Sequence, residues 1–163
     1  MSTSTIDRPQ LDAMPHHEGA TRLLIPAGLR LVVDAQDFEH LCAVNELPRL
    51  ELAADGGLIV MAPASPDGGG RENELCFQLT AWNKTKKLGK VFSPSAGYTL
   101  PNGAIRAPDA SWIRRERWEA LDAREQRRFS RIVPDFVAEI RSPSDGIETL
   151  RAKLAEYTAQ GVR

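Results

Sequence analysis

The sequence contains little cysteine and little histidine. Its 163 residues include two cysteines, Cys42 and Cys76, and three histidines. Two isolated cysteines cannot form a disulfide framework, which favours a reducing, cytoplasmic environment. The histidines have no Cys or His partners at the spacing of zinc ligands, so we expect no zinc site.

Long hydrophobic runs and a strong excess of one charge are also absent. The longest apolar stretches, such as residues 58–64 (LIVMAPA), are far too short to span a membrane. The N-terminus, MSTSTIDRPQ, lacks the apolar core of a secretory signal. A formal net charge of -1 argues against a protein that holds nucleic acid by bulk electrostatics. Any contact with nucleic acid therefore needs a local basic patch.

The composition is typical of one soluble globular domain. Hydrophobic residues make up 42% of the chain and charged residues 26%. Residues 1–20 are polar and aperiodic, which predicts a mobile N-terminal arm, and residues 21–163 are expected to form a single domain. The segment ASPDGGG, residues 64–70, is predicted to be a flexible loop.

The remaining pattern alternates short strands with helices. Asp34 is a suitable N-cap for a short helix around Phe38, and residues 49–63 predict a hairpin that turns at Asp55-Gly56-Gly57. A long helix is expected from Arg71 to a stop at Gly89. After it come short strands, a charged helical segment at 114–132, a strand at 135–141 and a helix ended by Gly161. We predict an α/β fold with a central mixed sheet flanked by helices.

Two charged residues occupy positions where apolar ones are expected. Glu139 interrupts the hydrophobic run 136–140, and Lys153 lies within the apolar stripe of the helix that follows. Lys and Glu are rarely buried unless they are paired or bound to something, because burying an unpaired charge costs several kcal/mol. The two residues flank a tight Ser-Pro-Ser-Asp turn, so the sequence predicts a functional site there.

Asp109 and Glu72 supply two further carboxylates. Asp109 opens a strand directly after Pro108, and Glu72 lies on the inward face of the long helix, with Glu74 expected at the solvent boundary. Carboxylates on adjacent strands can hold Mg²⁺, a cation that prefers oxygen ligands. Such a cation polarises a scissile phosphate and lowers the pKa of a bound water.

This set predicts hydrolysis of a phosphodiester. The expected ligands of Mg²⁺, or of another divalent cation, are Asp109, Glu139 and Glu72. Burial is expected to depress the pKa of Lys153, so that its amine orients the attacking water or helps to deprotonate it. The expected catalytic residues are Asp109, Glu139, Lys153 and Glu72.

Each of these residues also has a purely structural interpretation. Asp109 is a common turn former after proline, Glu139 could pair with Arg141, and Lys153 could cover its helix with an aliphatic stem. Glu72 could stabilise the dipole of its helix. The arginines between residues 114 and 131 alternate with glutamates, which is typical of a solvated face. The four residues together indicate a metal-dependent site more specifically than any one of them does alone.

The sequence resembles the Uma-two family of restriction-endonuclease-like proteins, part of the PD-(D/E)XK nuclease-like superfamily. The matching strings run from about residue 38 to 162: LELAADGGLIVMAPASPDGG, RENEL, LGKVFSPSAGYTLPNG, APDASWI, RWEAL and VPDFVAEIRSPSD with the later L, K, EY and G. The resemblance implies a restriction-endonuclease-like core with a divalent-metal site. It places Asp109 in the Pro-Asp motif, Glu139 before the Ser-Pro-Ser turn and Lys153 on the following helix. Glu72 best matches the helix position that faces the site, and Glu74 is second.

Two positions depart from the pattern. The general superfamily motif would place lysine at 141, but the chain has Arg141, whose guanidinium stays protonated and cannot act as a base. Similar proteins continue past Arg163 into a further strand, so we expect this chain to lack the final strand or strands of the fold. That loss would leave an uncovered sheet edge.

The expected partner is nucleic acid, with DNA preferred, and no membrane. A homodimer is expected only by analogy, because cleavage of a duplex requires two bond scissions. Two alternatives stay open from the sequence. One is a catalytically silent module that binds DNA or protein, and the other is a truncated, inactive fragment.

Overall fold

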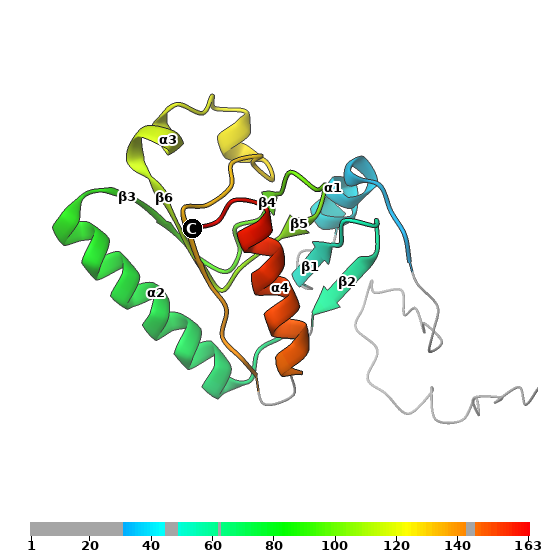
Figure 1. Cartoon of the computed structure of the whole chain (residues 1–163), viewed down its shortest axis with the longest axis horizontal. Coiled ribbons are helices and arrows are strands. Elements are labelled where there is room, and N and C mark those ends of the chain that lie inside the picture. Colours follow the sequence, from blue (N-terminus) through cyan, green and yellow to red (C-terminus); the bar gives the residue numbers. More distant parts are fainter. Residues whose placement is uncertain (1–30, 45–48, 62, 143–145) are drawn as a thin grey trace, which may run out of the picture.

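The computed structural model describes residues 31–44, 49–61, 63–142 and 146–163 (Figure 1). The expected N-terminal arm, residues 1–20, lies outside these residues. The helices are α1 (Ala35–Val44), α2 (Pro66–Lys86), α3 (Arg115–Glu119) and α4 (Ile147–Ala159), with a 3₁₀ turn η2 (Glu125–Arg127). The strands are β1 (Arg49–Leu52), β2 (Leu58–Met61), β3 (Gly89–Phe92), β4 (Tyr98–Thr99), β5 (Ile105–Arg106), β6 (Ala110–Arg114) and β7 (Phe136–Ala138).

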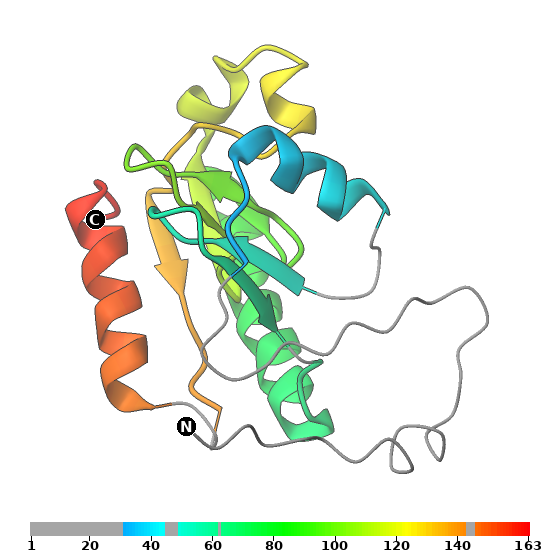
Figure 2. The same ribbon diagram turned by 90° about the vertical axis from the view of Figure 1, so that its right-hand side faces the viewer.

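The strands form two antiparallel sheets. One has the order β2-β1-β5-β4 and the other the order β3-β6-β7. Figure 2 shows α4 and α1 on opposite sides of the strands, with α2 running below them. The predicted α/β class with flanking helices is confirmed, although the strands that were expected in one mixed sheet are divided between two antiparallel ones.

The hairpin β1–β2 forms where the sequence predicted it. Leu52 pairs with Leu58, and Gly56 takes a positive φ of 80° in the turn, a conformation that glycine adopts without strain. Leu52 packs with Phe38 of α1 in a buried cluster. Because side chains alternate along a strand, Arg49 and Glu51 lie on the opposite face of β1.

The predicted loop at 64–70 is wrong for residues 66–70, because α2 already begins at Pro66. The Ser65 hydroxyl accepts a hydrogen bond from the Gly68 N–H at 3.2 Å, and proline occupies the first helical position. This N-terminal cap outweighs the low helix propensity of three consecutive glycines. The helix ends at Lys86 and is capped by Lys87, which adopts the left-handed conformation with φ of 55°, whereas Gly89 lies in β3.

The last helix packs over the β4–β5 turn. Tyr157 of α4 is 1% exposed and forms a buried cluster with Leu100, Ala104 and Val162. Gly161 follows the helix with φ of 104°, as expected of a glycine at a helix end. This packing holds one face of α4 against the strands and thereby fixes where Lys153 points.

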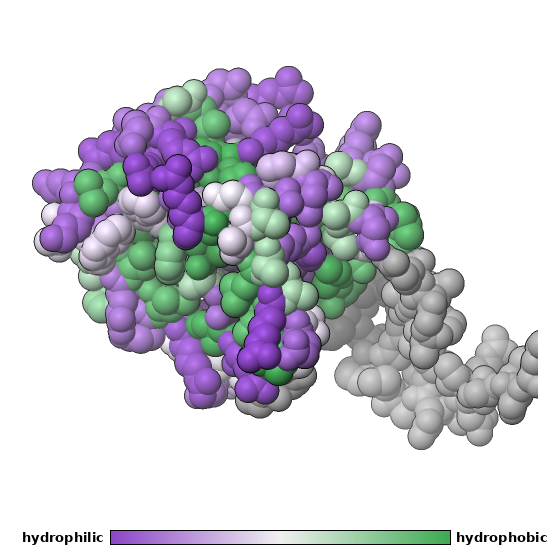
Figure 3. All heavy atoms as spheres, in the orientation of Figure 1, coloured by the Kyte–Doolittle hydropathy of each residue, from purple (hydrophilic) through white to green (hydrophobic). Residues whose placement is uncertain are grey.

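The surface carries scattered apolar side chains. Figure 3 shows hydrophobic areas between hydrophilic ones on the face that it displays. Among the exposed apolar side chains, Phe77, Phe136 and Leu154 are each exposed by 40% or more.

Strand β7 lies at the end of the strand order of its sheet. In the part of the chain that the structure describes, no helix has the length and apolar character to cross a membrane. The predicted loss of a final strand and the single domain at 21–163 stay predictions.

Candidate active site

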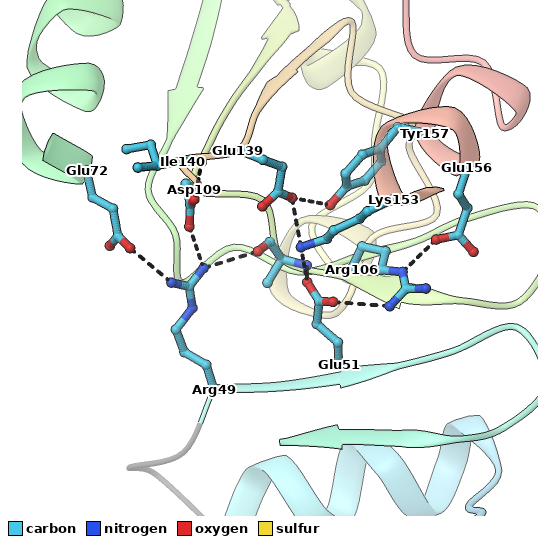
Figure 4. Close-up of polar contacts among 11 residues, drawn as sticks. Arg49, Glu51, Glu72, Arg106, Asp109, Glu139, Ile140, Lys153, Glu156 and Tyr157 are labelled. Atoms are coloured by element: carbon cyan, nitrogen blue, oxygen red, sulfur yellow. Dashed lines mark hydrogen bonds and ion pairs between the residues drawn. The ribbon is translucent and has the colours of Figure 1, made fainter. Parts of the chain in front are cut away.

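Asp109 and Glu139 lie opposite each other at one end of the β6–β7 pair. Ala110 pairs with Ala138 in antiparallel register, and continuing that register by one residue places Asp109 opposite Glu139. Asp109 Oδ2 accepts a hydrogen bond from the Ile140 N–H at 2.7 Å. Figure 4 shows both carboxyl groups in one polar cluster. The Asp109 carboxylate therefore binds the neighbouring strand segment, and it does not serve as a simple turn former.

Lys153 reaches the same cluster from α4. Its Nζ lies 2.8 Å from Glu139 Oε1 and 3.0 Å from Glu51 Oε1. The side chain points into the protein, as the sequence pattern predicted, and its ammonium bridges two buried carboxylates. The structural interpretation of Lys153 as a cover for its own helix is therefore not supported.

Sequence reasoning missed Glu51. This residue is 2% exposed, and its carboxylate accepts hydrogen bonds from the Ala107 N–H at 3.0 Å and from Arg106 Nη1 at 3.1 Å, besides pairing with Lys153. The available signal was the alternation in Arg49-Leu50-Glu51-Leu52, which places two charges on one strand face. A solvated face gives the same pattern, so the sequence could not show that α4 covers it.

Two residues on α4 complete the surroundings. The Tyr157 hydroxyl donates to Glu139 Oε1 at 3.0 Å, and Glu156 Oε2 accepts from Arg106 Nε at 2.7 Å. Arg106 is thus held between Glu51 and Glu156, with its side chain 11% exposed. These contacts fix the positions of both acids that bind Lys153.

Glu72 enters the site through Arg49. Arg49 Nη1 lies 3.5 Å from Glu72 Oε1, and Arg49 Nη2 lies 3.2 Å from Asp109 Oδ1 and 3.2 Å from the Ala107 carbonyl oxygen. Glu74 is exposed and accepts a hydrogen bond from Gln78 instead. Of the two glutamates that the sequence offered, Glu72 is the one that faces the site.

Burial and neighbouring charges shift two pKa values in the cluster. Burial raises the pKa of Glu139 above its ordinary value, and the ammonium of Lys153 only partly opposes this effect. Burial alone would lower the pKa of Lys153, but Glu51 and Glu139 outweigh it and raise that pKa above 10.5. The expectation of a depressed pKa for Lys153 is therefore wrong. Its amine is held as an ammonium, which is unsuited to act as a base.

The cluster carries an excess of acidic groups. Within the part of the chain that the structure describes, its ion pairs join five carboxylates to three cations, which leaves two negative charges in excess: Glu51, Glu72, Asp109, Glu139 and Glu156 against Arg49, Arg106 and Lys153. A divalent cation would balance this excess, and carboxylate oxygens are the ligands that Mg²⁺ prefers. Among the described residues, no three His, Cys, Asp or Glu side chains gather as a ready metal site. The donor chemistry fits such a cation, and Asp109 and Glu139 lie opposite each other in the register of the two strands.

Comparisons with known proteins identify the family of this chain and a structure with a similar fold. Residues 35–163 match the Uma2 family, described as "Putative restriction endonuclease". A crystal structure of "a putative nuclease belonging to DUF820" from Anabaena variabilis is similar, with a TM-score of 0.58 and 17% sequence identity. The match covers 71% of this chain and 63% of that protein, so the chain spans less than two-thirds of its length. A comparison with curated protein sequences found no match. Since the family match extends over most of the sequence, the chain belongs to the Uma2 family of nuclease-like proteins.

Proposed function

We propose that this protein is an endonuclease that hydrolyses phosphodiester bonds of nucleic acid, with DNA as the expected substrate, and that it depends on a divalent cation such as Mg²⁺. The observation that carries the proposal is the meeting of Asp109, Glu139 and Lys153 in one cluster. The family match, which extends over residues 35–163, supports the same reaction class.

Each residue has a defined role in this proposal. Asp109 and Glu139 would hold the cation, with Glu72 as a further carboxylate beside them. When bound, the cation would polarise the scissile phosphate and lower the pKa of a coordinated water. Lys153 would remain an ammonium and would stabilise negative charge that develops on the phosphate. Ile140 would keep Asp109 oriented through its backbone N–H.

Glu51 would act through Lys153. When a divalent cation binds Glu139, Lys153 would still have Glu51 as an ion-pair partner, at 3.0 Å. The ammonium would then remain charged and correctly placed. Tyr157 would hold Glu139 in a similar way, through its hydroxyl at 3.0 Å.

The proposal is tested by cleavage of plasmid and single-stranded DNA with the purified full chain at increasing Mg²⁺. We expect cleavage that a chelator abolishes and that falls by about 100-fold or more in Asp109→Asn and in Lys153→Met. The matched control is Glu74→Gln, which alters an exposed carboxylate on the helix that carries Glu72.

Retention of DNA without cleavage, unaffected by a chelator, would instead indicate a silent binding module. Cleavage that survives Asp109→Asn would show that the nuclease activity resides elsewhere or in a contaminant. A sedimentation measurement with and without a DNA duplex would test the expected homodimer.

A further inference from the structure

Arg49 occupies the space between two of the expected metal ligands. Its two terminal nitrogens point to different acids, Nη1 to Glu72 at 3.5 Å and Nη2 to Asp109 at 3.2 Å. Figure 4 shows the guanidinium between these two carboxylates. The acids come from α2 and from the start of β6, so no single element explains why they face the same arginine.

The contacts of Arg49 are weaker than those of Arg106, the other arginine in the cluster. Arg106 makes two ion pairs at 2.7 and 3.1 Å. Arg49 makes none shorter than 3.2 Å, and its side chain is 31% exposed. Its buried Nε also has no hydrogen-bond partner among the described residues. Leaving a buried donor unsatisfied is unfavourable, so this position is not the most favourable one for a guanidinium.

Lys153 and Arg49 differ in which partner each side chain would retain when a metal binds the carboxylate that it now contacts. Lys153 retains Glu51, which is buried and close. Among the residues that the structure describes, Arg49 would retain only the Ala107 carbonyl oxygen. A divalent cation bound to Asp109 would also repel the nearby guanidinium, because the separation is short and the surroundings are partly buried. Of the two internal cations beside the expected ligands, Arg49 is therefore the one that has to leave.

We infer that Arg49 is a displaceable counter-ion that competes with the divalent cation for Asp109 and Glu72. This inference rests on the proposed metal-dependent function and adds a residue that the sequence did not indicate. In the metal-free protein the guanidinium neutralises the two acids and keeps them together. Metal binding then releases it, and by linkage the guanidinium weakens metal affinity as much as the metal weakens its hold on the acids.

The first test is a Mn²⁺ titration of the full chain without nucleic acid, with free Mn²⁺ measured by electron paramagnetic resonance. Arg49→Met should bind Mn²⁺ more tightly than the wild type, by on the order of tenfold. The matched control is Arg71→Met, because Arg71 forms an exposed ion pair with Asp67 on the helix that carries Glu72. The control should bind Mn²⁺ with unchanged affinity.

A second measurement is made on the wild-type protein, and a variant serves only to assign one resonance. The Arg49 Nε–H resonance is assigned in a ¹⁵N spectrum by its loss in Arg49→Lys. We expect it to shift on addition of Mg²⁺, whereas the Arg71 resonance stays in place.

The outcomes separate the two proposals. Equal Mn²⁺ affinity in the wild type and Arg49→Met, or an Arg49 resonance that ignores saturating Mg²⁺, would overturn the competition alone. Weaker Mn²⁺ binding in Arg49→Met would also overturn it, because the arginine would then support the metal. A failure of both proteins to bind Mn²⁺ would overturn the proposed metal-dependent function as well.

Discussion

The ammonium of Lys153 and the carboxylate of Glu51 lie 3.0 Å apart and join the last helix to the first strand of the hairpin. Both side chains are largely buried, and Glu139 lies on the other side of the ammonium at 2.8 Å. One lysine therefore contacts an acid in β1 and an acid that directly follows β7. Its removal should affect stability as well as chemistry.

We expect Lys153→Met to lower the free energy of unfolding by about 3 kcal/mol at pH 8, because it leaves the buried Glu139 carboxylate without its cation and leaves Glu51, among the described residues, with an ion pair to Arg106 alone. The cost should shrink as pH falls toward 4.5, since burial already raises the pKa of Glu139 and protonation removes the unpaired charge. Urea denaturation at both pH values measures this effect. The control is Arg151→Met on the same helix, which removes an exposed ion pair with Glu148 and should cost less than ~0.5 kcal/mol. An equal loss of unfolding free energy in the two variants would contradict the buried ion pairs of Lys153.

Both tyrosines of the chain, Tyr98 and Tyr157, should titrate only when the protein unfolds. Burial is the main cause that raises the pKa of each above 10.0. The folded state thus keeps protons that the unfolded chain loses, so stability is full below pH 10 and declines as pH rises beyond it. Tyrosinate absorbance should therefore appear together with loss of circular dichroism, in one transition. Tyrosinate formation in the folded protein near pH 10 would contradict the burial of these rings.

Two glycines should respond to alanine in opposite directions. A Cβ at Gly89 would lie 2.2 Å from the Ile113 carbonyl oxygen and 2.5 Å from the Trp112 ring, whereas Gly69 has nothing within 4 Å. Gly89→Ala should destabilise the protein by more than ~2 kcal/mol. Gly69→Ala should stabilise it by about 0.5–1 kcal/mol, because alanine favours the helix. Thermal unfolding compares both variants. No gain from Gly69→Ala would indicate that residues 66–70 are not helical in solution.

Substitutions of Glu72 and Glu74, two glutamates on the same helix, allow a matched test of metal binding. Glu72 faces the site through Arg49, whereas Glu74 is exposed and bonded to Gln78. We expect Glu72→Gln to weaken Mn²⁺ binding several-fold, and Glu74→Gln to leave it unchanged. Isothermal titration calorimetry measures both affinities. A loss of affinity in the Glu74 variant alone would show that Glu74, and not Glu72, is the carboxylate of this helix that takes part in metal binding.

The argument from buried charge located much of the site. Glu139 and Lys153 stood out because each interrupts an apolar pattern, and the structure brings them within 2.8 Å of each other. Asp109 could be placed because it opens the neighbouring strand after Pro108. Glu139 and Lys153 were predictable because local sequence alone shows that their charges are out of place, but the catalytic roles of all three residues stay predictions.

Glu51 and Arg49 could not be found in this way. Alternation in β1 reveals two faces but does not say which one a helix will cover, and that choice depends on α4 about 100 residues later. The sign of the pKa shift of Lys153 was wrong for the same reason, since Glu51 supplies part of it. Long-range packing, rather than local pattern, decides these features.

Local propensity also failed at the start of α2. Three consecutive glycines indicated a loop, yet the cap at Ser65 and the proline after it start the helix there. Each effect is small in isolation, and their balance is not visible from composition. Family membership, by contrast, was predictable from motifs spread along the whole chain, and the match to residues 35–163 confirms it.

The order of synthesis has a consequence for this protein. A ribosome adds Arg49, Glu51 and Asp109 before Glu139 and Lys153, since the latter two belong to the last quarter of the chain. A nascent polypeptide therefore displays acids without the amine that joins them, and contacts between such distant segments close slowly. Translation has to reach the final helix before these side chains can meet, so a stalled or prematurely terminated product would lack the cluster.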